Sequence, residues 1–149
     1  MNALAIDLDE VLGDTRALWR DWLADAARRA RIDAEQLPDD RAAAADELDR
    51  VLGNWPVLLA RFAEDHAPVY LRPNAEVSAA LRALQGRGLR LGVFTDAPEP
   101  LARVALAQLG AARRLEAVET GRDALPRLLA RLGEEATVVR SRGALLSLA

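Results

Sequence analysis

The sequence predicts an α/β protein with a short parallel sheet of about four strands, helices on both faces of that sheet, and an inserted all-helical segment. Two observations lead to this prediction. From Asn74 onward, helix and strand patterns alternate three times, which is typical of a parallel sheet covered by helices. Residues 13–71 contain helical patterns and no strand pattern. We therefore expect a core of residues 1–12 and 72–149, and a helical insertion, or cap, of residues 13–71.

Four short apolar runs predict the strands. Strands that are buried on both faces of a parallel sheet are typically short, continuous apolar segments. Each of the first two runs is followed by polar residues, which is typical of the carboxyl end of such a strand. The predicted strands are Leu4–Leu8, Leu89–Thr95, Leu115–Val118 and Ala136–Val139.

Apolar residues at helical spacing predict the helices of the insertion. Asp14 is the predicted N-cap of the first helix, and either Asp39 or Asp40 is the predicted N-cap of the second. An extended stretch is expected after the third. The predicted segments are a helix at 15–32, a helix that ends at Leu52, a helix at Trp55–His66, and the extended stretch Ala67–Pro73.

Three further helices are expected between the later strands. Asn74 is the predicted N-cap of the first, and Pro98 and Pro100 mark the start of the second. Glycines follow the expected ends of these helices, where a left-handed backbone is often needed. The predicted helices are 74–84, about 98–109, and Asp123–Leu132, and a short apolar tail follows the last strand.

The composition excludes several kinds of chemistry. There is no cysteine, and all 20 cationic side chains are arginine, so disulfides, thiolate metal sites and Schiff-base catalysis are excluded. His66 is the single histidine, which argues against a multi-histidine metal site. The net charge of −3 argues against a nucleic-acid partner. Without a leader pattern or a membrane-length apolar run, we expect a soluble cytoplasmic protein.

Asp7 lies at the carboxyl end of the first strand, at the edge of a parallel sheet where ligands bind, and Asp9 is two residues further on. If the backbone stays extended there, the two side chains point the same way. Such a pair suits a nucleophile with a neighbouring acid or base, or a divalent cation. A solvated turn at the strand end is the alternative.

The neighbouring residues resemble a known family. From Leu4 to Thr15, an apolar strand leads into Asp-Leu-Asp-Glu-Val-Leu-Gly-Asp-Thr, and a second apolar strand ends at Thr95. These segments resemble the first and second motifs of the haloacid dehalogenase (HAD) superfamily. The resemblance implies a Rossmann-like core, a mobile helical cap, and a hydrolase of the phosphatase branch, which has the second aspartate.

The resemblance also implies roles for individual residues. Asp7 would attack phosphorus and form an aspartyl-phosphate, and Asp9 would act as the general acid and base. Thr95 and the backbone N–H groups that follow it, from Asp96, would hold the phosphoryl oxygens. Asp7 and the backbone carbonyl of Asp9 would bind Mg²⁺, and the substrate would be a small phosphorylated metabolite.

The sequence departs from the family pattern at the third motif. The family has a lysine there, and Arg122 takes its place as a phosphate-binding cation. Arginine supplies the charge, but its planar fork does not reproduce a point charge. Arg127 is a second candidate, and surface ion pairing is the alternative for both.

The fourth motif departs further, because no Asp or Glu follows Glu135. The family has metal-binding acids after the last strand, where this chain has Arg140 and Ser141. Ser141 is a weak neutral substitute for the acid. Alternatively, Arg140 pairs with Asp7 and disfavours a cation, or it contacts the phosphate itself in place of the metal. Glu10 replaces the family's glycine and is a possible compensating carboxylate. We therefore expect Mg²⁺ binding to be weakened.

Two functions remain open. The first is a phosphatase of a small phosphorylated metabolite, and the second is a catalytically impaired homologue with a binding or regulatory role. A phosphoacceptor receiver domain has similar strand-end residues, but it requires a lysine that this chain lacks.

Overall fold

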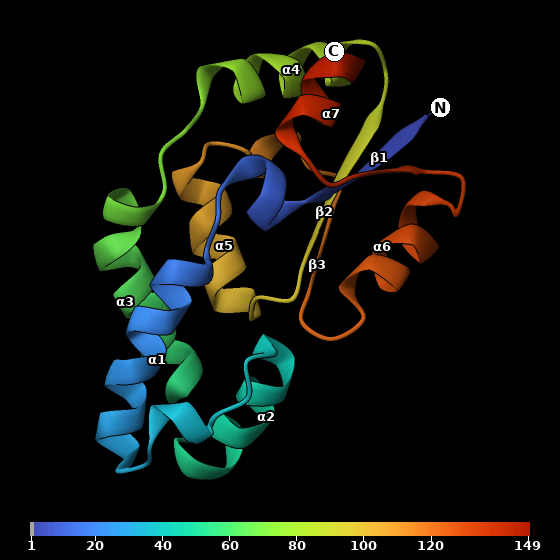
Figure 1. Ribbon diagram of the computed structural model, residues 1–149. Helices are drawn as coiled ribbons and strands as arrows, with labels where there is room; N and C mark the ends of the chain where they lie inside the picture. Colours follow the sequence, from blue (N-terminus) through green and yellow to red (C-terminus); the bar gives the residue numbers. More distant parts are fainter. Residues whose placement is uncertain (1) are drawn as a thin grey trace.

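The computed structural model describes residues 2–149 and has four parallel strands in one sheet (Figure 1). The spatial order is β3-β2-β1-β4, so the first strand lies inside the sheet. The α/β prediction and the expected number of strands are confirmed. The strands are β1 (Ala3–Asp7), β2 (Arg90–Thr95), β3 (Ala117–Thr120) and β4 (Thr137–Val139).

The register of the strands brings their carboxyl ends together. Ile6 of β1 lies opposite Val93 of β2 on one side and Val139 of β4 on the other. Asp7 is therefore the last residue of β1 and lies beside Phe94. All side chains that follow these strands emerge at the same edge of the sheet.

Helices cover both faces of the sheet, as the sequence predicts. Helix α6 (Ala124–Leu132) packs on the face formed by Ala3, Ala5 and Phe94. The opposite face carries Leu4, Ile6 and Leu91 and belongs to the larger core cluster. The other core helices are α4 (Ala75–Gly86), α5 (Glu99–Gln108) and α7 (Arg142–Leu148).

Helix α6 approaches the sheet closely because the residues beneath it are small. A Cβ atom at Gly92 would lie 2.8 Å from the Cδ1 atoms of Leu128 and Leu132. Alanines at positions 3, 5 and 117 leave similar room. This face therefore excludes larger side chains in β2.

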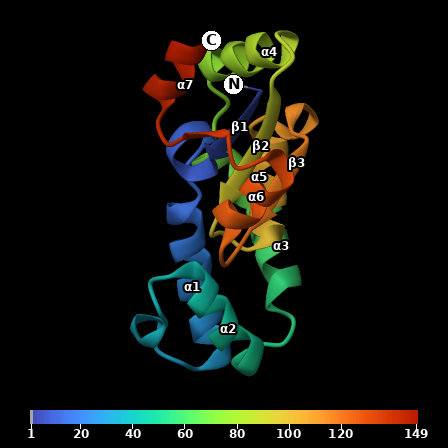
Figure 2. The same ribbon diagram turned by 90° about the vertical axis from the view of Figure 1, so that its right-hand side faces the viewer.

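The segment between β1 and α4 is helical, and no strand interrupts residues 13–71, all of which the structure describes. It extends away from the carboxyl edge of the sheet (Figures 1 and 2). Trp22 packs against both Trp19 and Trp55, with ring centroids 5.4 and 6.1 Å apart. We call this segment the helical insertion. It consists of α1 (Arg16–Ala30), the short 3₁₀ helix η2 (Ala34–Gln36), α2 (Arg41–Val51) and α3 (Trp55–Tyr70).

Two predictions at the helix starts are confirmed and one is wrong. Asp40 is the N-cap of α2 and Asn74 is the N-cap of α4, each accepting a backbone N–H in the first turn. Asp14 is not the N-cap of α1. Thr15 takes that position, and Asp14 lies one residue earlier, where its carboxylate accepts the N–H of Arg16 at 2.9 Å.

The expected extended stretch 67–73 is helical as far as Tyr70. Ala63 and Ala67 are buried, and α3 packs along α5, so tertiary contacts continue the helix past Pro68. The apolar tail after β4 forms α7, because Ser141 accepts the N–H of Ala144 at 3.1 Å and caps it. Within residues 2–149, no helix is long and apolar enough to cross a membrane.

Candidate active site

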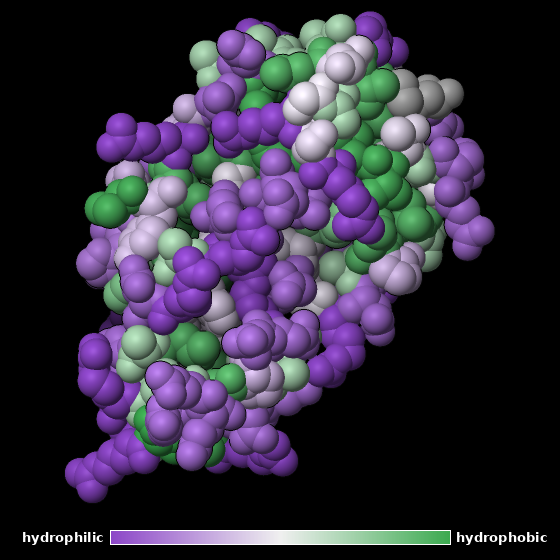
Figure 3. Space-filling view, in the orientation of Figure 1, coloured by the Kyte–Doolittle hydropathy of each residue, from purple (hydrophilic) through white to green (hydrophobic). Residues whose placement is uncertain are grey.

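Asp7, Asp9, Thr95 and Asp96 meet at the carboxyl edge of the sheet, as their positions at or just after the ends of β1 and β2 predict. They line a pocket of about 890 Å³ between this edge and the helical insertion. Hydrophilic side chains gather on the molecular surface between the sheet and the insertion (Figure 3). This pocket is the candidate active site.

Asp7 lines the pocket, and backbone N–H groups hold one of its carboxylate oxygens. The chain turns directly after β1 into the π-helical turn η1 (Leu8–Leu12), and Asp7 caps it. Its Oδ1 accepts the N–H groups of Asp9 at 3.1 Å and Glu10 at 3.4 Å. Burial raises the pKa of Asp7 above its ordinary value, against the lowering effect of these N–H groups, and the charge of Asp9 adds to the rise. Oδ2 makes neither of these bonds.

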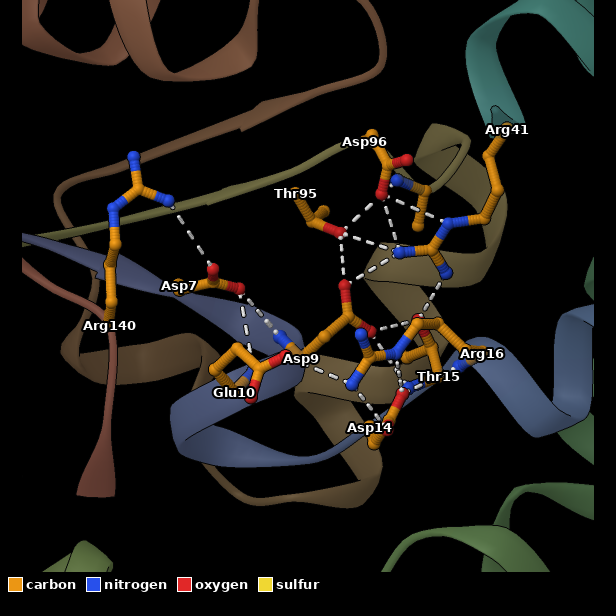
Figure 4. A network of polar contacts seen from close by, with 11 residues as sticks. Asp7, Asp9, Glu10, Asp14, Thr15, Arg16, Arg41, Thr95, Asp96 and Arg140 are labelled. Carbon is orange, nitrogen blue, oxygen red and sulfur yellow. Dashed lines mark hydrogen bonds and ion pairs between the residues drawn. The ribbon is translucent and has the colours of Figure 1, made fainter. Parts of the chain in front are cut away.

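Asp9 does not point the same way as Asp7, because the backbone after Asp7 is not extended. The Oδ1 atom of Asp9 accepts the backbone N–H and the hydroxyl of Thr15, at 2.8 and 2.5 Å. Its Oδ2 accepts the Thr95 hydroxyl at 3.0 Å and an Arg41 Nη2–H at 2.6 Å. Figure 4 shows Asp7 directed towards Arg140, and Asp9 directed towards Thr95 and Arg41.

Arg41 is a site residue that the sequence analysis did not identify. It is the first residue of α2, and only 3% of it is exposed. Its guanidinium donates to Asp9 Oδ2 and Asp96 Oδ1, both at 2.6 Å, and to the Thr15 hydroxyl at 2.7 Å. An arginine in the first turn of a helix resembles a surface residue in sequence. The sequence does contain one indication of such a residue. Several acids gather at the strand ends, and burying them requires a cation from another part of the chain.

Thr95 and Asp96 complete this network. The Thr95 hydroxyl donates to Asp9 and accepts the N–H of Ala97 at 3.1 Å. Asp96 receives two bonds from Arg41, and 49% of its side chain is exposed. The network therefore joins the helical insertion to the ends of β1 and β2.

Arg122 and Arg127 lie in other surroundings. Arg122 pairs with Asp46 of α2 at 2.9 Å, and 57% of its side chain is exposed. Arg127 pairs with Glu119 at 2.6 Å and also donates to two backbone carbonyls. Both arginines make surface ion pairs, the alternative role that the sequence allows for them. The phosphate-binding role of Arg122 stays a prediction.

Arg140 faces Asp7. Its Nη1 lies 4.0 Å from Asp7 Oδ2, and its side chain is 62% exposed. The guanidinium also lies over the Phe94 ring, with 5.4 Å between Cζ and the ring centroid. This geometry agrees with an ion pair between Arg140 and Asp7.

The side chains around Asp7 do not fit a magnesium ion. Mg²⁺ takes octahedral oxygen coordination that usually includes carboxylates. Glu10 is paired with Arg16 at 3.0 Å, and the Ser141 hydroxyl caps α7. Within residues 2–149, no three His, Cys, Asp or Glu side chains are grouped to hold a metal. Asp7 is left with an arginine where a second acid would be needed.

Comparison with known proteins supports the fold. No family model and no curated protein matches the sequence. Among solved structures, CbbY from Rhodobacter sphaeroides in complex with phosphate matches with a TM-score of 0.68 and 15% identity, over 93% of this chain and 76% of that one. A HAD phosphatase from Thermococcus onnurineus matches with a TM-score of 0.57 and 18% identity, over 100% and 83% of the two chains.

A third structure agrees with these two. A HAD-superfamily hydrolase of subfamily IA from Geobacter sulfurreducens matches with a TM-score of 0.57 and 19% identity, over 100% of this chain and 86% of that one. At such identities the likeness concerns the fold. The chain therefore has the Rossmann-like α/β fold with a helical insertion that is found in phosphatases of the haloacid dehalogenase superfamily.

Proposed function

We propose that this chain hydrolyses the phosphate monoester of a small phosphorylated metabolite, with Asp7 as the nucleophile. One observation carries the proposal. Asp7 ends an inner strand and lines a pocket of about 890 Å³, and two backbone N–H groups hold its Oδ1 while Oδ2 accepts neither of them. A carboxylate held in this way is oriented for attack on a group bound in the pocket.

The reaction would proceed in two steps. An Asp7 oxygen bonds to phosphorus while the bond from phosphorus to the ester oxygen breaks, and protonated Asp9 donates its proton to the leaving oxygen. Asp9 then takes a proton from water, whose oxygen attacks phosphorus and releases Asp7. Thr95 and the N–H groups that follow it hold the phosphoryl oxygens.

Asp9 has to change partners before it can act in this way. Both of its oxygens are already occupied by Thr15, Thr95 and Arg41. Because Arg41 belongs to the helical insertion, a movement of α2 away from the sheet would release Asp9. The proposal therefore links proton transfer to the position of the insertion.

The pocket wall supports a small organic phosphate as the substrate. The insertion contributes the apolar side chains of Trp19, Leu23 and Leu37, together with Arg16 and Arg20. The insertion also adds the acids Glu35 and Asp39, and such a mixed lining suits a compact body that carries a further polar group. A CbbY structure solved with xylulose-1,5-bisphosphate is a neighbour of this fold, at 14% identity.

Arg140 favours a second candidate function. A guanidinium beside the nucleophile, in place of an acid, is also consistent with a homologue that binds a phosphorylated ligand and does not turn it over. Such a protein would keep the pocket and lose the reaction. The two candidates differ in one observable, the release of phosphate.

A hydrolysis assay separates them. The wild-type chain and the Asp7→Asn variant are incubated with a panel of phosphate monoesters, in EDTA and in Mg²⁺, and released phosphate is measured. Hydrolysis that the substitution abolishes supports the phosphatase. Intact-protein mass spectrometry after acid quenching should then show one added phosphoryl group in the wild type only. Binding of the esters without release of phosphate would support the second candidate.

A further inference from the structure

Arg140 stands at the sheet edge where the HAD resemblance expects an acidic metal ligand. Val139 of β4 lies opposite Ile6 of β1, so the next residues, Arg140 and Asp7, leave the two strands side by side. The Arg140 Nη1 atom lies 4.0 Å from Asp7 Oδ2 (Figure 4). The candidate nucleophile therefore has a positive charge on its β4 side.

The Arg140 guanidinium is accessible to a ligand. Its side chain is 62% exposed, and its contact with Asp7 is longer than a hydrogen bond. Stacking on the Phe94 ring holds the group in place. Arg41, by contrast, is buried and already shared between Asp9 and Asp96. Within residues 2–149, no other cationic side chain lies within 4.0 Å of the Asp7 carboxylate.

The charges disfavour a divalent cation and favour an oxyanion. A divalent cation beside Asp7 would find one carboxylate and be repelled by the guanidinium of Arg140. A phosphoryl group would meet several N–H donors in a planar fork, which match two of its oxygens. Asp7 and Arg140 form a neutral pair, and the neighbouring acids Asp9 and Glu10 are paired with Arg41 and Arg16, so the local charge does not exclude an anion.

We propose that Arg140 takes the place of the Mg²⁺ ion that the HAD resemblance implies, an inference that rests on the proposed function. The site binds the oxyanion of phosphate, or of a phosphate monoester, with Arg140 as its counter-ion and without a divalent cation. The ligand class is the same as in the proposed reaction. The cation that binds the phosphoryl oxygens is then a side chain of the protein, Arg140, and not a bound metal ion.

Calorimetric titration with inorganic phosphate tests this inference, in EDTA and in MgCl₂. The Kd of the wild-type chain for phosphate should be the same in EDTA and in MgCl₂. The variants Arg140→Gln and Arg140→Asp should each weaken binding in EDTA by about tenfold or more, the range expected when a charged hydrogen-bond partner is lost. Arg140→Asp should in addition regain binding when MgCl₂ is present, and Arg140→Gln should not.

A charge-matched control is Arg82→Asp, which changes an exposed arginine on α4 outside the pocket. It should leave the wild-type Kd unchanged. Thermal unfolding of all four proteins shows whether a variant has lost its fold, and the exposed Arg140→Gln is expected to keep it. Phosphate binding by the wild type that is absent in EDTA, or unaltered binding by Arg140→Gln, overturns the inference.

The hydrolysis assay with phosphate monoesters tests the proposed function separately from the role of Arg140. Hydrolysis by the wild type that requires Mg²⁺ overturns the role of Arg140 and leaves the phosphatase standing. Binding of phosphate in EDTA that depends on Arg140, without hydrolysis of any ester, supports the role of Arg140 and overturns the phosphatase.

Discussion

Arg41 is the residue whose removal should destabilise this fold most clearly among the polar groups of the site. Arg41 is 3% exposed, and its guanidinium donates to Asp9, Asp96 and Thr15. Arg41→Met keeps most of the volume and removes the charge. The Asp9 carboxylate, whose side chain is 8% exposed, would then stay buried without its cation.

The expected loss follows from the two ion pairs. Breaking a buried pair by removing one partner costs about 3–5 kcal/mol. Asp9 keeps its bonds from Thr15 and Thr95, which places the loss near the lower end. Asp96 is half exposed, so its pair with Arg41 adds about 0–1 kcal/mol. We expect a total of about 3 kcal/mol, a large part of the about 5–15 kcal/mol typical of a domain.

Urea unfolding at pH 7, followed by fluorescence and by circular dichroism, measures this loss. Arg61→Met, which changes an exposed arginine on α3 of the same insertion, should shift the free energy of unfolding by less than about 0.5 kcal/mol. In a double-mutant cycle, Asp9→Asn should relieve about 1 kcal/mol or more of the cost of Arg41→Met. A loss below about 1 kcal/mol for Arg41→Met would refute the buried ion pair.

Three further predictions concern stability. Burial raises the pKa of Asp7 and so disfavours its ionised form in the folded chain. Asp7→Asn should therefore raise the Tm at pH 7. This increase in Tm should vanish below about pH 3.9, where the carboxyl group is protonated in the unfolded chain as well. Arg16 lowers the pKa of Asp14, so Asp14→Asn should reduce the free energy of unfolding at pH 7, by only about 0.5 kcal/mol because solvent screens this exposed pair. The reduction should become smaller as the pH falls through the pKa of Asp14 in the folded chain. Gly92→Ala should cost about 1–3 kcal/mol in chemical denaturation, because its Cβ would meet α6, whereas Gly86→Ala, with open space around it, should not destabilise the chain. An unchanged midpoint for Gly92→Ala would contradict the close packing of α6.

The sheet and its edge could be predicted because they depend on local patterns. Apolar runs identify strands that are buried on both faces, and strand ends in a parallel sheet meet at one edge. Asp7 and Thr95 were therefore expected together, and the structure brings them together. The missing acid after β4 was also visible, because it is an absence in the sequence itself.

The directions of the side chains could not be predicted in the same way. Asp9 turns from Asp7 because a π-helical turn follows β1, and no local pattern distinguishes that turn from continued strand. Arg41 reaches Asp9 across 32 positions of sequence, a contact that depends on how α2 packs. Arg122, whose phosphate-binding role stays a prediction, pairs on the surface with Asp46 of α2, a partner that no local pattern indicates. Each of these depends on tertiary packing.

A crystal structure with tungstate, an electron-dense mimic of phosphate, tests the central claim most directly. If Arg140 is the counter-ion of the phosphate site, crystals grown with EDTA will show density for the anion beside Asp7, within hydrogen-bonding reach of the Arg140 guanidinium. Well-ordered crystals with tungstate bound elsewhere and no density beside Asp7 would contradict this role of Arg140.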